Sequence, residues 1–436
     1  MNADTGLISC SIEKAEFLGW NAVYLRNNLV SVVAVPDIGG RLMAYNLHEY
    51  PFLYVDPDLA GKLFTPQENQ GDGSLAAWKN YGGDKTWPAP QGWDDDSQWH
   101  GPPDPILDSG RYRLERAELE AGKAVVVMVS PPDSRTGIQI TRQVTLYPNS
   151  TRVQLVLTFT NVSNHILRWS IWDVVQLRAE RTTPEGETTF DPGCLVTTPL
   201  NPHSRFNEGF NIMFGKADNP QWTSDPQQGL FIARYLWEIG KVGLDSPAGW
   251  IAFNNTSKGK AFVERFSYFP DQEYPDQGAS VECWTVGKGT VANLDYENSG
   301  IYLMETEVLS PLYQIEPGKK ASFNLEWNAC SIDGMVAGVS EAGCDSQPFK
   351  AIRKDTGAHI TGTFGVFDPG DLRLVWLDLQ GNELTGQSLG LVSPLENIRL
   401  DQQVAIPEHT HQAVLILRAN DQDYHLSHTF LEQTNP

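Results

Sequence analysis

The chain has 436 residues, with 32 basic and 54 acidic side chains, so its formal net charge is −22. A surface of this sign repels nucleic-acid phosphates and anionic lipid headgroups, which argues against nucleic-acid and membrane partners. Hydrophobic residues make up 40% of the chain, and the longest uninterrupted apolar run, residues 124–129, is too short to cross a bilayer.

The N-terminal residues 1–10 have neither a basic start nor an apolar run, so we expect no secretory signal and a cytoplasmic location. The five cysteines are widely spaced and include no C-x-x-C pair, which predicts reduced thiols and no zinc site. Phosphate-loop, dinucleotide-binding, serine-hydrolase and zinc-protease motifs are missing from the sequence. The sequence therefore predicts no cofactor and no metal, and it leaves the oligomeric state open.

Alternating apolar and polar residues predict β-strands through most of the chain. Residues 152–160 are an example, since Val153, Leu155 and Leu157 fall on one face of an extended segment. Proline and asparagine turns separate these runs. We expect an antiparallel meander followed by one further strand, at residues 112–120, 124–130, 138–147, 152–160 and 167–177, and no helix longer than two turns.

Glycine, serine, alanine and aspartate become frequent at residues 335–360, directly after a strong strand signal at 321–330. Beyond this segment, residues 372–379 predict a strand and residues 380–382 a hairpin turn. The pattern predicts an all-β chain of two domains. The first comprises residues 1–335, and the second, residues 345–436, is a small β-sandwich of unknown role.

Residues 64–105 form the most unusual segment, because a long glycine- and proline-rich loop is expected there and long ordered loops are usually functional. Trp78, Trp87, Trp93 and Trp99 fall within it, among charged side chains and His100. Indole faces stack on the C–H faces of sugar rings, while neighbouring polar groups bind hydroxyls. A sugar cleft is the functional interpretation, and tryptophans that close one end of a β-sandwich are the alternative.

Two strand-like segments carry buried or paired acids. Asp173 follows Trp172 in an apolar strand, where a carboxylate is costly unless it is paired, so it is either a site acid or the partner of Arg168 or Arg178. Glu305 and Glu307 are two residues apart and share a strand face, where two carboxylates raise one pKa and suit acid–base chemistry. The alternative is an acidic edge strand that faces water.

The segments LVSVVAVPDIGGRLMAYNLHEYPFLY, LTFTNVSNHILRWSIWDVVQL and YLMETEVLSPLYQIEPGKKASFNLEW resemble the opening, central and closing strands of galactose mutarotase-like proteins. The tryptophan-rich loop ENQGDGSLAAWKNYGGDKTWPAPQGW is similar to the DUF4380-type branch of that superfamily. The resemblance covers about residues 10–335 and implies a mutarotase-like β-supersandwich, followed by the small C-terminal β-sandwich.

In the epimerases of this superfamily, a glutamate removes the proton of the anomeric hydroxyl and a histidine protonates the ring oxygen. The resemblance places Glu305 at the base position. Trp172 and Asp173 stand where the histidine is expected, and Arg41 and His100 are the counterparts of the family's arginine and first histidine. The resemblance therefore implies that Asp173 or His100 supplies the acid, or that the epimerase chemistry is lost.

We therefore expect a carbohydrate ligand and aldose 1-epimerase-like proton transfer, with a non-catalytic sugar-binding protein as the first alternative. A glycoside hydrolase or polysaccharide lyase that uses Glu305 with Asp173 is the second alternative. The expected catalytic residues are Glu305, Asp173 and His100. The expected substrate-binding residues are Arg41, Trp78, Lys79, Asn80, Asp84, Lys85, Trp87, Trp172, Lys241 and Glu307.

Overall fold

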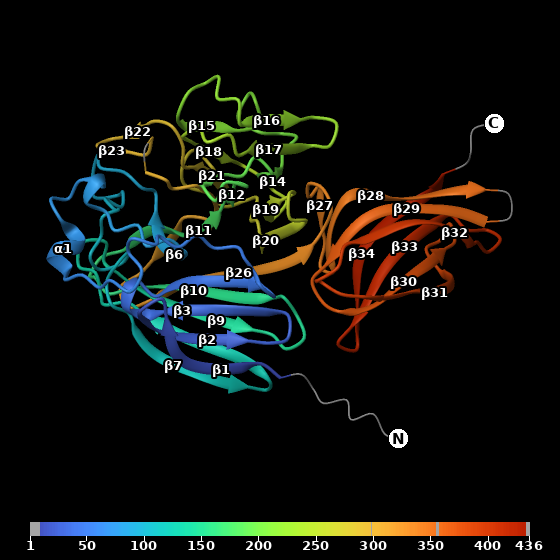
Figure 1. Ribbon diagram of the computed structural model, residues 1–436, viewed down its shortest axis with the longest axis horizontal. Coiled ribbons are helices and arrows are strands. Elements are labelled where there is room, and N and C mark those ends of the chain that lie inside the picture. Colours follow the sequence, from blue (N-terminus) through green and yellow to red (C-terminus); the bar gives the residue numbers. More distant parts are fainter. Residues whose placement is uncertain (1–8, 298, 355–356, 433–436) are drawn as a thin grey trace.

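The computed structural model describes residues 9–297, 299–354 and 357–432, and nearly every element in it is a β-strand (Figure 1). Within these residues the only α-helix is the five-residue α1 (Pro66–Gln70), and two 3₁₀ turns, η1 (Pro36–Ile38) and η2 (Leu75–Ala77), accompany it. None of the helices in the described ranges has the length and apolar character of a membrane span. The prediction of an all-β chain is confirmed.

The first large sheet has 12 strands. They are β1 (Ser11–Phe17), β2 (Trp20–Arg26), β3 (Val30–Val35), β4 (Arg41–Leu47), β5 (Tyr50–Pro51), β6 (Asp84–Ala89), β11 (Leu167–Arg178), β15 (Asn211–Phe214), β18 (Gly240–Leu244), β21 (Val281–Thr285), β24 (Leu303–Leu309) and β25 (Tyr313–Ile315). Their order is β1-β2-β3-β4-β6-β11-β24-β21-β18-β15, with β5 beside β4 and β25 beside β11. Segments far apart in the sequence thus become neighbours at β6, β11 and β24.

The second large sheet has 10 strands. They are β7 (Arg113–Glu120), β8 (Lys123–Val129), β9 (Ile138–Leu146), β10 (Val153–Asn161), β14 (Cys194–Pro199), β16 (Trp222–Asp225), β17 (Leu230–Arg234), β19 (Trp250–Asn255), β20 (Lys260–Phe266) and β26 (Lys320–Ser331). Their order is β16-β17-β14-β19-β20-β26-β10-β9-β8-β7, so the antiparallel meander predicted for residues 112–160 is confirmed. Two small hairpins lie outside both sheets, β12 (Glu180–Thr182) with β13 (Thr188–Phe190) and β22 (Thr290–Val291) with β23 (Leu294–Asp295).

The two large sheets pack face to face through a continuous apolar core. The Tyr45 ring of β4 lies 5.8 Å from the Phe262 ring of β20 and 5.7 Å from the Trp327 ring of β26. In β10, alternate side chains are buried in this core, as the period-2 pattern of residues 152–160 predicts. Because one face of the 12-stranded sheet is used for this packing, the opposite face is free to form a site.

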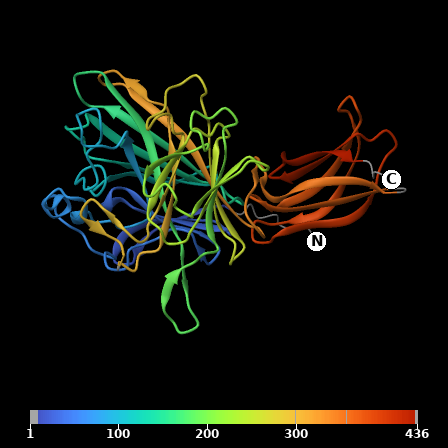
Figure 2. The ribbon, with the colours of Figure 1, turned by 90° about the horizontal axis from the view of Figure 1, so that it is seen from above.

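The C-terminal strands form a separate lobe with its own core, shown in orange and red in Figure 1 and beside the larger body in Figure 2. They are β27 (Gly338–Val339), β28 (Gly343–Lys354), β29 (Gly357–Val366), β30 (Gly370–Leu377), β31 (Glu383–Val392), β32 (Ile398–Ala405), β33 (Gln412–Ala419) and β34 (Gln422–Glu432). The order is β31-β30-β33-β34-β28-β29-β32, with β27 beside β28. The domain division between residues 335 and 345 stays a prediction.

An apolar cluster joins β20 and β26 of the larger body to the start of the C-terminal strands. Within it, the Sγ atoms of Cys330 and Cys344 lie 3.2 Å apart, and all five cysteines are free. The backbone nitrogen of Thr151 also donates a hydrogen bond of 2.9 Å to the carbonyl oxygen of Phe367. Apolar packing and backbone hydrogen bonds therefore both cross this boundary.

One expectation for residues 64–105 is wrong, because the segment is not a continuous loop. It contains β6, an interior strand in which all six residues are buried. Asp84, Lys85 and Pro88 interrupt the apolar pattern by which such a strand is normally recognised. Pro88 is tolerated because β4 pairs with β6 only through Leu42 and Asp84. The edge of β6 that faces β4 therefore has no strand partner near Pro88.

Candidate functional site

A cavity of about 300 Å³ lies on the face of the 12-stranded sheet that points away from the core. Seven aromatic side chains line it, namely Trp78, Trp87, Trp93, Trp172, Phe214, Trp284 and Tyr296. The polar lining consists of Asn80, Gln91, Gln176, Lys241, Asp276, Glu282 and Glu305. An aromatic wall with a few placed polar groups is the usual composition of a small-ligand site.

The strand register explains why residues from the neighbouring strands β6, β11, β24 and β21 meet at this cavity. Trp87 of β6 pairs with Trp172 of β11, and Gln176 of β11 pairs with Glu305 of β24. Glu305 in turn pairs with Trp284 of β21. Directly paired residues and residues two apart share one face of a sheet, so all of these side chains point the same way.

Glu305 is held at the cavity by two donors from neighbouring strands. The Nζ atom of Lys85 lies 3.0 Å from its Oε1 atom, and Nε2 of Gln176 donates a hydrogen bond of 2.7 Å to the same oxygen. Lys85 is buried behind the lining, with its Nζ atom 4.9 Å from the Trp87 ring centre. Burial lowers the pKa of Lys85, although Glu305 opposes that shift.

A second ion group lies beside the first on the same face. The Nζ atom of Lys241 lies 2.7 Å from Oε2 of Glu282 and 2.9 Å from Oε2 of Glu307. Nε1 of Trp172 donates a 2.9 Å hydrogen bond to Glu307. Burial raises the pKa of Glu282 to about 7 and that of Glu307 to about 8, even though Lys241 lowers both. One ammonium group therefore does not balance the charges of two carboxylates, and the pKa values of both carboxyl groups lie near neutral pH.

The positions of two indoles in the wall depend on Asp108, which the sequence analysis did not single out. Nε1 of Trp78 and Nε1 of Trp87 donate hydrogen bonds of 2.9 and 3.1 Å to its two carboxylate oxygens. Arg41 forms an ion pair with the same carboxylate, and both side chains are fully buried. Arg41 therefore acts on the cavity only through Asp108. An aspartate at the end of a tryptophan-rich segment is too weak a signal to reveal this from sequence.

Asp84 and Asp173 lie on the opposite face of their strands, between the two large sheets. Asp84 forms an ion pair with Arg142 of β9, and Thr86 Oγ1 donates a 3.4 Å hydrogen bond to Asp173. Burial, with the negative charges of Asp84 and Glu264, raises the pKa of Asp173 well above its usual value.

This placement corrects both predictions made for Asp173. The side chain does not line the cavity with Glu305, and neither of the two expected arginines pairs with it. Arg168 instead pairs with Glu273, and Arg178 with Glu180. The register of the strands explains the difference. Gln176 pairs directly with Glu305 and therefore shares its face of the sheet. Asp173 is three residues from Gln176 on the same strand, so its side chain points to the opposite face.

Of the remaining predicted site residues, some line the cavity and others lie outside it. Asn80 lines the cavity, whereas Lys79 has its Nζ atom 5.4 Å from the Phe64 ring. His100 lies outside the lining, with ring Nε2 3.0 Å from the Asp95 carbonyl oxygen. Trp99 is fully buried, 4.7 Å from Trp87 between ring centres. Trp99 is thus part of the buried core, while the other three loop tryptophans reach the cavity.

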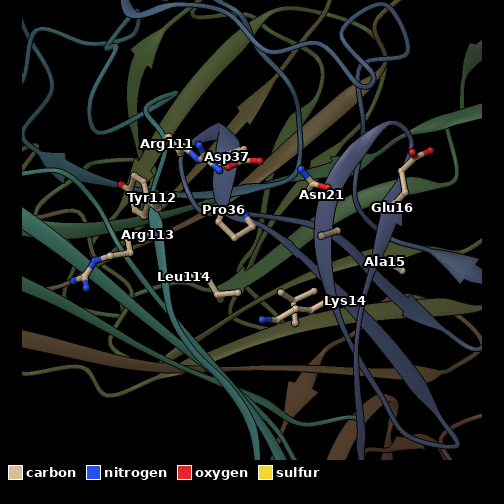
Figure 3. Close-up of a pocket in the computed structure, with 12 residues that line it drawn as sticks. Lys14, Ala15, Glu16, Asn21, Pro36, Asp37, Arg111, Tyr112, Arg113 and Leu114 are labelled. Carbon is tan, nitrogen blue, oxygen red and sulfur yellow. Dashed lines mark ion pairs between the residues drawn. The ribbon is translucent and has the colours of Figure 1, made fainter.

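A larger groove of about 630 Å³ lies between the edges of the two large sheets, at β1, β2, η1 and the start of β7 (Figure 3). Its lining includes Lys14, Asn21 and Leu114, and an ion pair of 2.7 Å joins Arg111 to Asp37. No tryptophan and no predicted site residue is in this lining. Within the described ranges, no three acidic, histidine or cysteine side chains are grouped to hold a metal ion.

A comparison with known protein families agrees with the predicted resemblance for one part of the chain. Residues 21–183 match the family model described as "Domain of unknown function (DUF4380)". Among curated proteins, none matches this sequence.

Solved structures with a similar arrangement include a galactose mutarotase-like protein from Clostridium acetobutylicum. It is 11% identical with a TM-score of 0.47, and the alignment covers 74% of this chain and 99% of that one. A "putative aldose 1-epimerase" from Klebsiella pneumoniae is 12% identical with a TM-score of 0.49, covering 73% of this chain and 82% of the other. At such values these structures assign no reaction to the chain. The matched segment contains β6, β11 and the tryptophan loop.

Proposed function

We propose that the cavity binds a carbohydrate and that Glu305 moves a proton at the bound sugar, in the manner of an aldose 1-epimerase. The observation that carries this proposal is the carboxyl group of Glu305 in the lining of a cavity walled by Trp78, Trp87, Trp172 and Trp284. Indole faces suit the apolar faces of a pyranose, and the amide and charged groups of the lining suit its hydroxyls.

Two donors on one oxygen of Glu305 position its carboxyl group for the role of a base. Lys85 and Gln176 both contact Oε1, and a carboxylate fixed at one oxygen presents the other to a ligand. In the proposed step, Glu305 takes the proton of the anomeric hydroxyl, the bond between the anomeric carbon and the ring oxygen breaks, and the ring oxygen gains a proton. The open aldehyde then recloses with either configuration.

The donor of that second proton is not Asp173 or His100, because neither side chain lines the cavity. This observation supports a second candidate function, a carbohydrate-binding protein without turnover. The hydrolase alternative loses its carboxylate pair, since Glu305 and Asp173 lie on opposite faces of the sheet.

The test uses NMR to measure the rate of anomeric interconversion of freshly dissolved α-glucose and α-galactose. Catalysis by the wild-type protein that is lost in Glu305→Gln, with binding retained in calorimetry, is the result expected for an epimerase. Glu316→Gln, an exposed turn residue outside the cavity, is the matched control and should behave as wild type. Binding without acceleration would favour the second function, and neither binding nor acceleration would refute both.

A further inference from the structure

One end of the cavity carries more negative than positive groups. Asp276 and Glu282 line this end, and Glu307 lies directly behind it. Lys241 contacts two of these three carboxyl groups, at 2.7 Å from Glu282 and 2.9 Å from Glu307. The second lysine near the cavity, Lys85, is already paired with Glu305. Three carboxyl groups therefore meet one ammonium group at this end.

Glu282 has an oxygen that the described residues leave without a hydrogen-bond donor. Its side chain is 1% exposed, and neither of its oxygens has a hydrogen-bond partner among the described residues, although Oε2 forms an ion pair of 2.7 Å with Nζ of Lys241. A buried carboxylate oxygen without a partner is costly, so it is satisfied either by a proton or by a cation. The carboxyl's raised pKa, about 7, is the consequence when no ligand cation is present.

The aromatic wall at this end is suited to a positive charge. Trp284 and Phe214 lie 5.7 Å apart between ring centres. A third ring of the same cavity, that of Trp172, already accommodates an ammonium group, because Lys241 Nζ lies 4.4 Å from its centre. Aromatic faces attract cations through their quadrupole, and the attraction grows when water is excluded. The net charge of −22 acts in the same direction at long range.

We infer that the cavity takes a sugar that carries a free ammonium group, an aminohexose, with the ammonium between Asp276 and Glu282 and the ring against the tryptophans. The inference rests on the proposed function and adds the charge of the ligand to it. A neutral hexose leaves the Glu282 oxygen without a cation, whereas an ammonium group donates to it and to Asp276. An N-acetylated sugar has neither the charge nor the compact donor.

The test is isothermal titration calorimetry on the full chain with glucose, galactose, glucosamine, galactosamine and N-acetylglucosamine. Each aminohexose should bind at least about tenfold more tightly than its parent hexose, the margin of one charge-assisted contact. Glu282→Gln should reduce that preference to about twofold or less. Asp276→Asn, at a partly exposed position, is the second variant if Glu282→Gln does not fold, and Glu316→Gln is the control.

A second readout is proton release. Because burial raises the pKa of Glu282 to about 7, an entering ammonium should expel protons from this carboxyl near neutral pH, and the apparent enthalpy should vary with the ionisation enthalpy of the buffer. Equal or weaker binding of the aminohexoses, or no buffer dependence, would overturn the inference and leave the proposed function standing. Failure of all five sugars to bind would instead refute the proposed function itself.

Discussion

The Nζ atom of Lys85 lies 3.0 Å from Oε1 of Glu305, although the two residues are 220 positions apart in the sequence. Strand β11 lies between their two strands, and its Gln176 donates to the same oxygen. The orientation of the candidate base is therefore fixed by three adjacent strands rather than by a loop. A site built in this way holds its geometry without a ligand.

Lys85→Met should destabilise the fold by about 3 kcal/mol, because it leaves the carboxylate of Glu305 without a cation in a water-poor site. The side chain of Lys85 is 1% exposed and that of Glu305 is 11% exposed, so little water replaces the lost partner. Urea unfolding measures the loss. The double variant Lys85→Met/Glu305→Leu removes both charges and should be more stable than Lys85→Met alone. Additive losses would contradict a direct pairing.

Asp173→Asn and Asp84→Asn should differ strongly in stability at pH 7. Burial and neighbouring acids raise the pKa of Asp173, which favours its neutral form, so a neutral amide should cost less than about 1 kcal/mol. Asp84→Asn breaks the buried ion pair with Arg142 and should cost about 3–5 kcal/mol. Chemical denaturation of the two variants compares them. Equal losses would show that Asp173 is ionised.

Glu282→Gln should flatten the dependence of stability on pH between about 4.5 and 7. The folded-state pKa of Glu282 is raised from 4.5 to about 7, so in this window the folded protein binds a proton that the unfolded chain has released. Wild-type stability should consequently fall as pH rises, by up to about 1.4 kcal/mol per pH unit from this group. Urea midpoints across the window test this. A slope unchanged in the variant would assign the dependence to other groups.

Gly39→Ala should disturb the tryptophan wall although Gly39 does not touch the cavity. Gly39 has a φ of +83°, and a Cβ atom there would lie 1.9 Å from the carbonyl oxygen of Asp108. We expect a loss of at least about 3 kcal/mol and a changed near-ultraviolet circular dichroism spectrum from Trp78 and Trp87.

Gly381→Ala is the matched control for this substitution. Gly381 has a similar φ of +81°, but nothing lies within 4 Å of its added Cβ atom, so only backbone strain of about 1 kcal/mol remains. If both variants lose the same stability, the close approach to Asp108 is not the reason that glycine is needed at position 39.

Local pattern was sufficient where one face of a strand is apolar. The alternation in residues 152–160 predicts β10, and the spacing of Glu305 and Glu307 correctly places both on one face. The same reasoning failed for β6, because Asp84, Lys85 and Pro88 hide a fully buried strand. Its burial depends on the neighbouring strand β11 and on ion partners distant in sequence, which no local window contains.

The sequence by itself determined that the chain is all-β, that residues 112–160 form a meander, and that tryptophans gather near charged residues, since these follow from periodicity and composition. Only the tertiary structure decided which charged groups share a site. Lys85 and Asp84 are adjacent in sequence, yet one points to the cavity with Glu305 and the other into the core with Arg142. The physical reason is the pleat of the strand, which sends neighbours to opposite faces, while strand order in the sheet selects their partners.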